Sequence, residues 1–281
     1  MVGLRNCGTV CYVNSALQQL YHMDDVRNFL VRLSNLHCAH QADETGGHAA
    51  AALNVCRAIG DLFRCMLQVG GDGEATGGTA ASEGAATEGC PSVDPLECYK
   101  TIYPVIVRAQ GRGGELDGGT YDLLYDREGD VSALLREVLC CVYGAMDGAA
   151  PSLGDCPPSS LLRGSLVHML RVHGEETSKS ETFFLLSLNV SGGSLSVALD
   201  TYFAPQEMAL PGESIAVVRC ALEVAPQHLL LHLKRISYAD SQRRKVFSYF
   251  EYDERISLTK YALEQGGVYE YELGKQSLVH L

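Results

Sequence analysis

The sequence has few basic residues: 22 Lys and Arg stand against 34 Asp and Glu, for a formal net charge of −12. A nucleic-acid-binding protein usually needs a basic surface, so this balance argues against that class. Long apolar runs are also missing. The run LLLHL (residues 229–233) is far too short to span a bilayer, which argues against a membrane protein. The first residues, MVGLRNCG, lack the apolar stretch of a secretory signal peptide.

Cysteine pairs with the CxxC spacing are absent, although the chain has eleven cysteines. An odd number of cysteines scattered through 281 residues does not fit the disulfide framework of a small secreted protein. We therefore expect free thiols and a reducing compartment, cytoplasmic or nuclear. The sequence also has no Walker motif, GxGxxG fingerprint or HExxH pair, and we expect no cofactor.

What is present divides into a helical first half and a β-rich second half. Apolar periodicity predicts helices over 12–33, 50–67 and 130–146, the last with Asp130 as N-cap, and a short helix with a connector over 94–107. After about residue 160 the period changes to two, and strands are predicted over 183–190, 228–238 and 269–281. Helices followed by strands predict the α+β class.

Three segments are predicted to connect these elements. Residues 69–92 consist almost entirely of Gly, Ala, Thr, Ser and Glu, so they cannot bury enough apolar surface to order the chain and predict a disordered insertion. Residues 146–160 are rich in Pro, Gly and Ser, which predicts a loop. The charged run Arg243–Lys245 is interpreted as a solvated hairpin turn.

One cysteine, Cys11, stands between a glycine-rich turn and a helical pattern in GLRNCGTVCYVNSALQQLY, residues 3–21. A thiol reacts as the thiolate, and the positive end of a helix dipole favours that anion. Backbone N–H groups there can hold an oxyanion, and Asn6 is near enough in sequence to add its side-chain amide. The other interpretation is a small buried apolar residue, as free cysteines often are. The local pattern leaves both open.

The whole string resembles the Cys box of the ubiquitin-specific proteases, which is roughly GLxNxGNTCYxNSxLQxL. Most of its fixed positions agree at fixed spacing from Gly3 through Cys11 to Leu20, and Thr9-Val10 is a mild departure. By this resemblance Cys11 is the nucleophile, and Asn6 is the side chain that helps to hold the oxyanion.

Later segments resemble later parts of the same family in the same order. They are DVSALL (130–135) for the QQDAxEFL segment, ETFFLLSL (181–188) for the ExFxxLxL strand, 194–203 for the short helix after it, LLLHLKR (229–235) for LxLHLKRF, and 269–281 for the strand that leads to the catalytic His. The sequence departs from the first of these segments: Glu128 and Gly129 stand where the family has two Gln, and Ala133 stands for its Glu.

The resemblance implies a papain-like α+β fold. We expect a helical thumb over residues 1–150 that contains the insertion 69–92, fingers over 160–225, and a β palm over 226–281 whose C-terminal part is missing. It also implies a deubiquitinase, a thiol-dependent hydrolase of the peptide or isopeptide bond after the C-terminal Gly of ubiquitin. Its partners would be ubiquitin and ubiquitinated proteins.

The resemblance does not supply a general base within this sequence. In the family the base lies in a GHY segment shortly beyond the strand that here ends with Val279–His280, and an Asp or Asn further on orients it. The sequence stops at Leu281, and His280 aligns with a structural histidine. A catalytically inactive ubiquitin-binding pseudo-protease, or a fragment lacking its His base, is therefore the alternative.

Many members of the family hold a zinc ion in the fingers with two CxxC pairs. The corresponding regions of this sequence offer His168, His173 and Cys220. A structural zinc site needs four N or S ligands, so we expect no metal.

Overall fold

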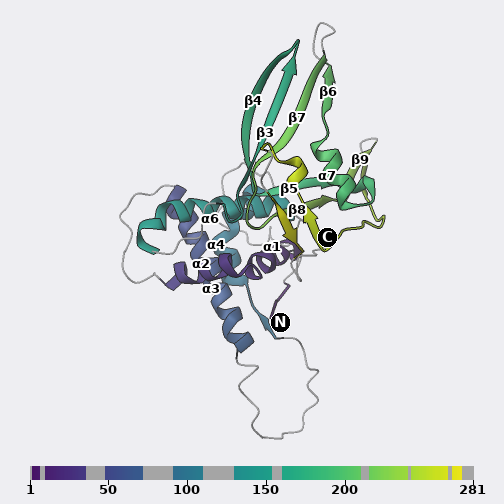
Figure 1. Cartoon of the computed structure of the whole chain (residues 1–281). Helices are drawn as coiled ribbons and strands as arrows, with labels where there is room; N and C mark the ends of the chain where they lie inside the picture. The colour runs from purple at the N-terminus through teal and green to yellow at the C-terminus, as the bar shows by residue number, and fades with distance from the viewer. Residues whose placement is uncertain are drawn as a thin grey trace, which may run out of the picture. The chain divides into compact units, whose positions relative to one another are not determined.

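The computed structural model of the chain describes residues 2–6, 10–35, 48–71, 91–109, 130–153, 160–209, 215–239, 242–264 and 268–273 (Figure 1). The chain divides into two compact units, which meet in sequence between residues 157 and 158. The first is helical and the second is built mainly of antiparallel strands. This mixture agrees with the predicted α+β class. The division into thumb, fingers and palm stays a prediction.

The first unit contains most of the helices. Its elements in chain order are β1 (Gly3–Leu4), α1 (Cys11–Tyr21), α2 (Asp24–Asn35), α3 (His48–Gly71), β2 (Ser92–Val93), α4 (Leu96–Ala109) and α6 (Val131–Leu153). The two short strands pair in parallel, with Gly3 opposite Ser92. Each helix turns an apolar stripe inward, because side chains three and four residues apart share a face. Asp130 caps α6: its Oδ1 accepts a bond from the Ser132 amide at 2.7 Å.

Close packing of α2 on α3 depends on one glycine. A Cβ atom at Gly60 would lie 2.1 Å from the carbonyl oxygen of Leu30, so only glycine lets the two backbones approach this closely. Phe29 and Leu30 of α2 and Phe63 of α3 are fully buried around this crossing. The α2–α3 contact is therefore set by backbone proximity as well as by side-chain packing.

The helix boundaries differ from the predictions at three places. The helix predicted over 12–33 is two helices, because Asp24 and Asp25 begin α2, where carboxylates favour a helix N-terminus. Helix α3 continues to Gly71, into the predicted insertion, and a Cβ atom at Gly70 would lie 3.2 Å from a methyl carbon of Val2. Ser92, the last residue of that insertion, belongs to β2, and residues 72–90 lie outside the described residues. Helix α6 runs to Leu153, through the first part of the predicted loop.

The second unit contains most of the strands. Its elements are β3 (Gly164–Val172), β4 (Glu175–Phe183), β5 (Leu185–Asn189), η3 (Val190–Gly192), α7 (Leu195–Phe203), β6 (Gln206–Ala209), β7 (Ile215–Val224), β8 (Leu230–Lys234), β9 (Ile236–Ala239), β10 (Gln242–Lys245), β11 (Arg255–Ser257), η4 (Thr259–Tyr261) and β12 (Glu270–Glu272). A four-stranded antiparallel sheet has the order β4-β3-β7-β6, with long β3, β4 and β7 (Figure 1). Strands β5 and β8 pair in parallel, with Leu186 opposite Leu231.

The apolar core of this unit lies under helix α7. It joins Leu186 and Leu188 of β5, Leu199 of α7, Leu222 of β7 and Leu258, all nearly inaccessible to solvent. The alternation predicted for this strand holds only in part, because Leu185 is buried as well as Leu186. Burial on both sides follows from the position of β5 within the core.

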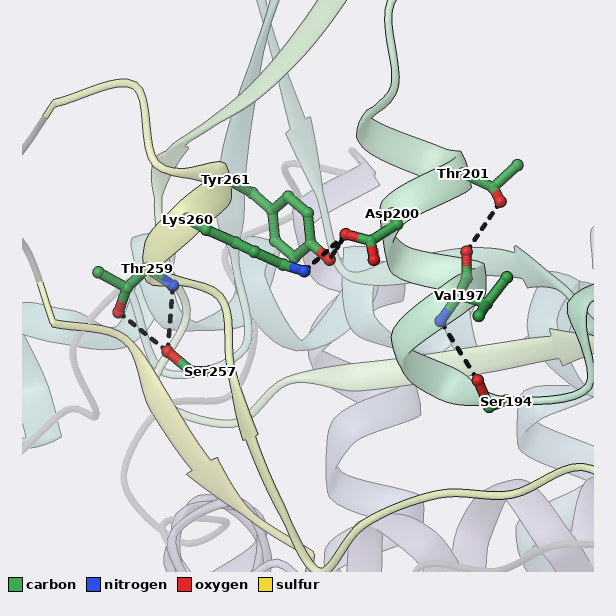
Figure 2. Close-up of polar contacts among 8 residues, drawn as sticks. All are labelled: Ser194, Val197, Asp200, Thr201, Ser257, Thr259, Lys260 and Tyr261. Carbon is green, nitrogen blue, oxygen red and sulfur yellow. Dashed lines mark hydrogen bonds and ion pairs between the residues drawn. The ribbon is translucent and has the colours of Figure 1, made fainter.

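Polar contacts hold helix α7 at its start and at Asp200 (Figure 2). At its start, the Ser194 side chain accepts a bond from the Val197 amide at 3.4 Å. Further along, one carboxylate oxygen of Asp200 accepts bonds from Lys260 Nζ at 2.6 Å and from the Tyr261 hydroxyl at 2.7 Å. The Tyr261 ring also stacks on Phe203, with ring centroids 4.5 Å apart. These contacts attach the turn η4 to α7.

Two strand predictions need correction. Arg243–Lys245 are not a turn: they belong to β10, which pairs with β9 in an antiparallel hairpin. The strand predicted over 228–238 is two strands, β8 and β9, which are interrupted at Arg235. The Arg235 side chain donates a hydrogen bond to the carbonyl of Ser248 at 3.0 Å. Of the strand predicted over 269–281, the described residues place β12 at 270–272, and 274–281 lie outside them. No helix in the described ranges is long and apolar enough to cross a bilayer.

Candidate active site

Cys11 is the first residue of α1, a helix whose apolar stripe is buried in the first unit. Tyr12, Val13 and Leu17 lie inside, whereas Cys11 is exposed at the helix end. The preceding Val10 has no side-chain oxygen or nitrogen and makes no side-chain cap. By helix geometry the Cys11 amide has no acceptor within the helix, so it is available to bind an anion. The sequence pattern placed Cys11 at a helix N-terminus, and the structure puts it there.

Burial separates Cys11 from the thiols of the helical core. Cys56, Cys98 and Cys141 are buried. Burial raises the pKa of Cys98 to about 12 and also raises the pKa of Cys56 and of Cys141, because a thiolate loses its hydration there. In the second unit, burial raises the pKa of Cys220 to about 11. A neutral thiol is a poor nucleophile, so these four cysteines are weaker candidates for the nucleophile than Cys11.

Asn6 lies at the end of the segment that contains β1. Its neighbour Arg5 donates its amide to the Val93 carbonyl at 2.9 Å, and Gly3 donates to the Pro91 carbonyl at 2.9 Å. The Arg5 side chain also forms an exposed ion pair with Asp94 at 3.2 Å. Asn6 itself is exposed. Residues 7–9, which connect it to α1, are not described, so the role of Asn6 stays a prediction.

Two amide side chains of α1 hold this segment from the helix side. Asn14 Nδ2 donates to the Arg5 carbonyl at 3.3 Å, and Gln18 Nε2 donates to the Val2 carbonyl at 3.1 Å. The hydroxyl of Tyr99, on α4, donates to Asn14 Oδ1. Asn14 and Gln18 lie within the Cys box, but the resemblance implies no role for them. Their i, i+4 spacing on the polar face of α1 was the available signal, and nothing in the sequence pointed to Tyr99.

The one histidine of the first unit with a described side chain is His22. It follows α1 at the C-terminal end, about 16 Å along the axis from Cys11 at the helical rise per residue. Burial and the nearby Arg27 guanidinium lower the pKa of His22. His22 is therefore too far from Cys11 to act as its base. His280, the predicted structural histidine, lies outside the described residues.

The histidines predicted for the fingers are on β3 and its turn. His168 lies opposite Cys220 of β7, and its Nε2 is 3.4 Å from a carboxylate oxygen of Glu181. His173 occupies the β3–β4 turn with φ of 50°. Within the described ranges, no group of three or more His, Cys, Asp or Glu side chains is placed to hold a metal ion. His232, in the strand β8, has its Nδ1 3.1 Å from the Ser187 hydroxyl of β5.

The first unit is helical and has an exposed cysteine at the start of a buried helix, and the second unit is mainly antiparallel β. This arrangement is typical of the papain-like class of cysteine hydrolases. A comparison with family models makes the class specific. The chain belongs to the ubiquitin carboxyl-terminal hydrolase family, whose model matches residues 2–274. No curated protein matches the chain.

Membership of this family confirms the resemblance that the Cys box indicated, and with it the papain-like fold. The family is one of cysteine-type hydrolases that act on ubiquitin, and membership in it supports a function of the deubiquitinase type in general. The match covers both units, from β1 to the last described strand. The resemblances quoted from the second half lie within this match, except for residues 275–281.

Proposed function

We propose that Cys11 is the nucleophile that cleaves the peptide or isopeptide bond after the C-terminal Gly of ubiquitin. The observation that carries this proposal is the exposed thiol of Cys11 at the uncapped start of α1, while Cys56, Cys98 and Cys141 are buried. A thiolate there attacks the Gly carbonyl, and the carbonyl electron pair moves to oxygen. The Cys11 amide and the Asn6 side chain hold that oxyanion.

The tetrahedral intermediate then collapses to a thioester and expels the amine, which takes a proton from a general acid. Water attacks the thioester and releases ubiquitin with a free carboxylate and the thiol. These proton transfers need a histidine, and His22 is at the wrong end of α1 for that role. The nucleophile and the proton carrier are therefore tested by separate measurements.

The nucleophile is tested with ubiquitin that carries a C-terminal electrophile. We expect one covalent adduct, lost in Cys11→Ala and retained in Cys65→Ala, which removes another exposed thiol. Asn6→Ala is expected to slow turnover by about 10²-fold or more, as for other single oxyanion donors. Absence of an adduct with the wild-type chain contradicts the proposal.

Turnover of a ubiquitin amide substrate tests the proton carrier. An adduct together with turnover supports the hydrolase. An adduct without turnover, combined with measurable binding of unmodified ubiquitin, supports the alternative of a ubiquitin-binding chain that lacks its base. The departures from the family pattern at Gly129 and Ala133 are a second reason for this alternative.

A further inference from the structure

The segment that leads to Asn6 is bound on both of its edges. The amides of Gly3 and Arg5 pair with the segment that contains β2, at 2.9 Å each. The carbonyls of Val2 and Arg5 accept bonds from Gln18 and Asn14 of α1. Because the C=O and N–H of one peptide point in opposite directions, the Val2–Gly3 peptide is fixed from both sides.

The Asn14 bond acts at the peptide next to the oxyanion residue. The acceptor is the Arg5 carbonyl, which belongs to the Arg5–Asn6 peptide, and the distance is 3.3 Å. Fixing that carbonyl fixes the plane of the peptide, and so the direction in which the Asn6 backbone leaves it. Asn14 is on the first turn of α1, three residues after Cys11. One side chain therefore relates the backbone at Asn6 to the helix that carries the thiol.

The Tyr99 hydroxyl holds the Asn14 amide on the side away from Arg5. A carbonyl can only accept a hydrogen bond, so Asn14 must present its NH₂ group to Arg5. Its oxygen then faces the Tyr99 hydroxyl, which donates to it. Tyr99 is 1% exposed and is held in α4, where its amide bonds the Pro95 carbonyl at 3.0 Å. A buried donor thus orients the amide from the opposite side.

We propose that Asn14, oriented by Tyr99, is a positioning residue that sets the Asn6 oxyanion donor relative to the Cys11 thiol. This inference rests on the proposed roles of Cys11 and Asn6. It predicts that loss of the Tyr99 hydroxyl weakens oxyanion binding while the thiol itself stays reactive. A contact that served only the stability of the fold would not separate these two properties.

Two reagents measure oxyanion binding and thiol reactivity separately. Ubiquitin with a C-terminal aldehyde adds to the thiolate: a C–S bond forms, and the carbonyl electron pair goes to oxygen, which takes a proton from water. That oxygen occupies the oxyanion position, so the affinity of the chain for the aldehyde depends on Asn6. Iodoacetamide alkylates the same sulfur by displacing iodide, with no oxyanion, and reports only on access and ionisation of the thiol.

In Tyr99→Phe we expect aldehyde affinity to fall about tenfold, part of the 10²–10³-fold effect of losing a whole oxyanion donor. Alkylation of Cys11 is expected to change by less than about twofold, because the helix dipole and exposure of the thiol are unchanged. Asn14→Asp, which cannot donate to the Arg5 carbonyl, is expected to show a larger loss. Tyr103→Phe, the same change one turn along α4, is the matched control and is expected to match wild type.

The outcomes separate the two proposals. No aldehyde adduct with wild type overturns the proposed function and, with it, this inference. A wild-type adduct whose affinity is unchanged in Tyr99→Phe overturns the positioning role alone, as does an equal loss in both reactions. Amide hydrogen exchange of residues 2–6 provides a readout that needs no ubiquitin. We expect faster exchange there in Tyr99→Phe than in Tyr103→Phe, and equal rates contradict the positioning role.

Discussion

At the scale of single residues, Asp200 makes the stability of the folded state depend on pH. Hydrogen bonds from Lys260 and from the Tyr261 hydroxyl lower the pKa of Asp200 below its ordinary 3.8. A carboxyl whose pKa is lower in the folded state stabilises the fold above its unfolded pKa, and that contribution is lost as pH falls through the folded value. The pKa of Tyr261 is raised to about 12, mainly by burial, so its hydroxyl remains a donor throughout this range.

We therefore expect Asp200→Asn to lower Tm at pH 7 and to have a smaller effect at an acidic pH below the folded pKa of the native carboxyl, which is then neutral as well. Thermal unfolding followed by circular dichroism at the two pH values measures this. Asp253→Asn, at another exposed aspartate of the second unit, is the control and is expected to change Tm little at either pH. An Asp200→Asn effect of the same size at both pH values would show that the carboxylate charge is not what holds η4.

At the scale of elements, the α2–α3 crossing is the contact most sensitive to a small change. A methyl group at Gly60 would meet the Leu30 carbonyl at 2.1 Å, so Gly60→Ala forces the helices apart. Overpacking of this kind costs about 1–3 kcal/mol of unfolding free energy. Gly144→Ala in α6 is the matched control, because its Cβ would lie 3.8 Å from the Ala52 side chain, an ordinary contact.

Urea unfolding of the two variants checks this expectation. In a helix interior Ala is favoured over Gly by about 0.5–1 kcal/mol, so Gly144→Ala is expected to be neutral or stabilising. The same substitution is thus expected to lower the free energy of unfolding at Gly60 and to leave it unchanged or raise it at Gly144. Equal effects at Gly60 and Gly144 would rule out the close approach of α2 and α3.

The elements also show where prediction from the sequence succeeds and where it ends. Periodicity found the helices around Cys11 and Asp130, because the apolar spacing and the caps are local signals. It merged α1 with α2, although Asp24 and Asp25 signal a new N-terminus. The contact between Asn14 and Tyr99 joins residues 85 positions apart, and the approach of Gly60 to Leu30 depends on how two helices cross. Neither leaves a pattern in the sequence.

At the scale of the whole molecule, each of the two compact units has an apolar core among its described residues. In the first unit the core lies among the buried faces of α1–α4 and α6. In the second unit it lies between β5, α7 and β7. Each core is built from residues of one compact unit. Local opening follows such cooperative units, so the stability of each unit is expected to respond to its own core residues. A single unfolding free energy would then describe this protein poorly.

Hydrogen exchange followed by mass spectrometry tests this organisation with one variant in each unit. Leu222 of β7 is 1% exposed, and truncation of a buried leucine costs about 2–5 kcal/mol. We expect Leu222→Ala to accelerate exchange in β3, β5 and β7, and Gly60→Ala to accelerate it in α2 and α3. Each variant is expected to leave the slowest amides of the other unit within about twofold of wild type, because their own core is intact. Acceleration of both units by either variant would mean that the chain opens as one cooperative body, and Cys11 on the first unit would then share its stability with the sheets of the second.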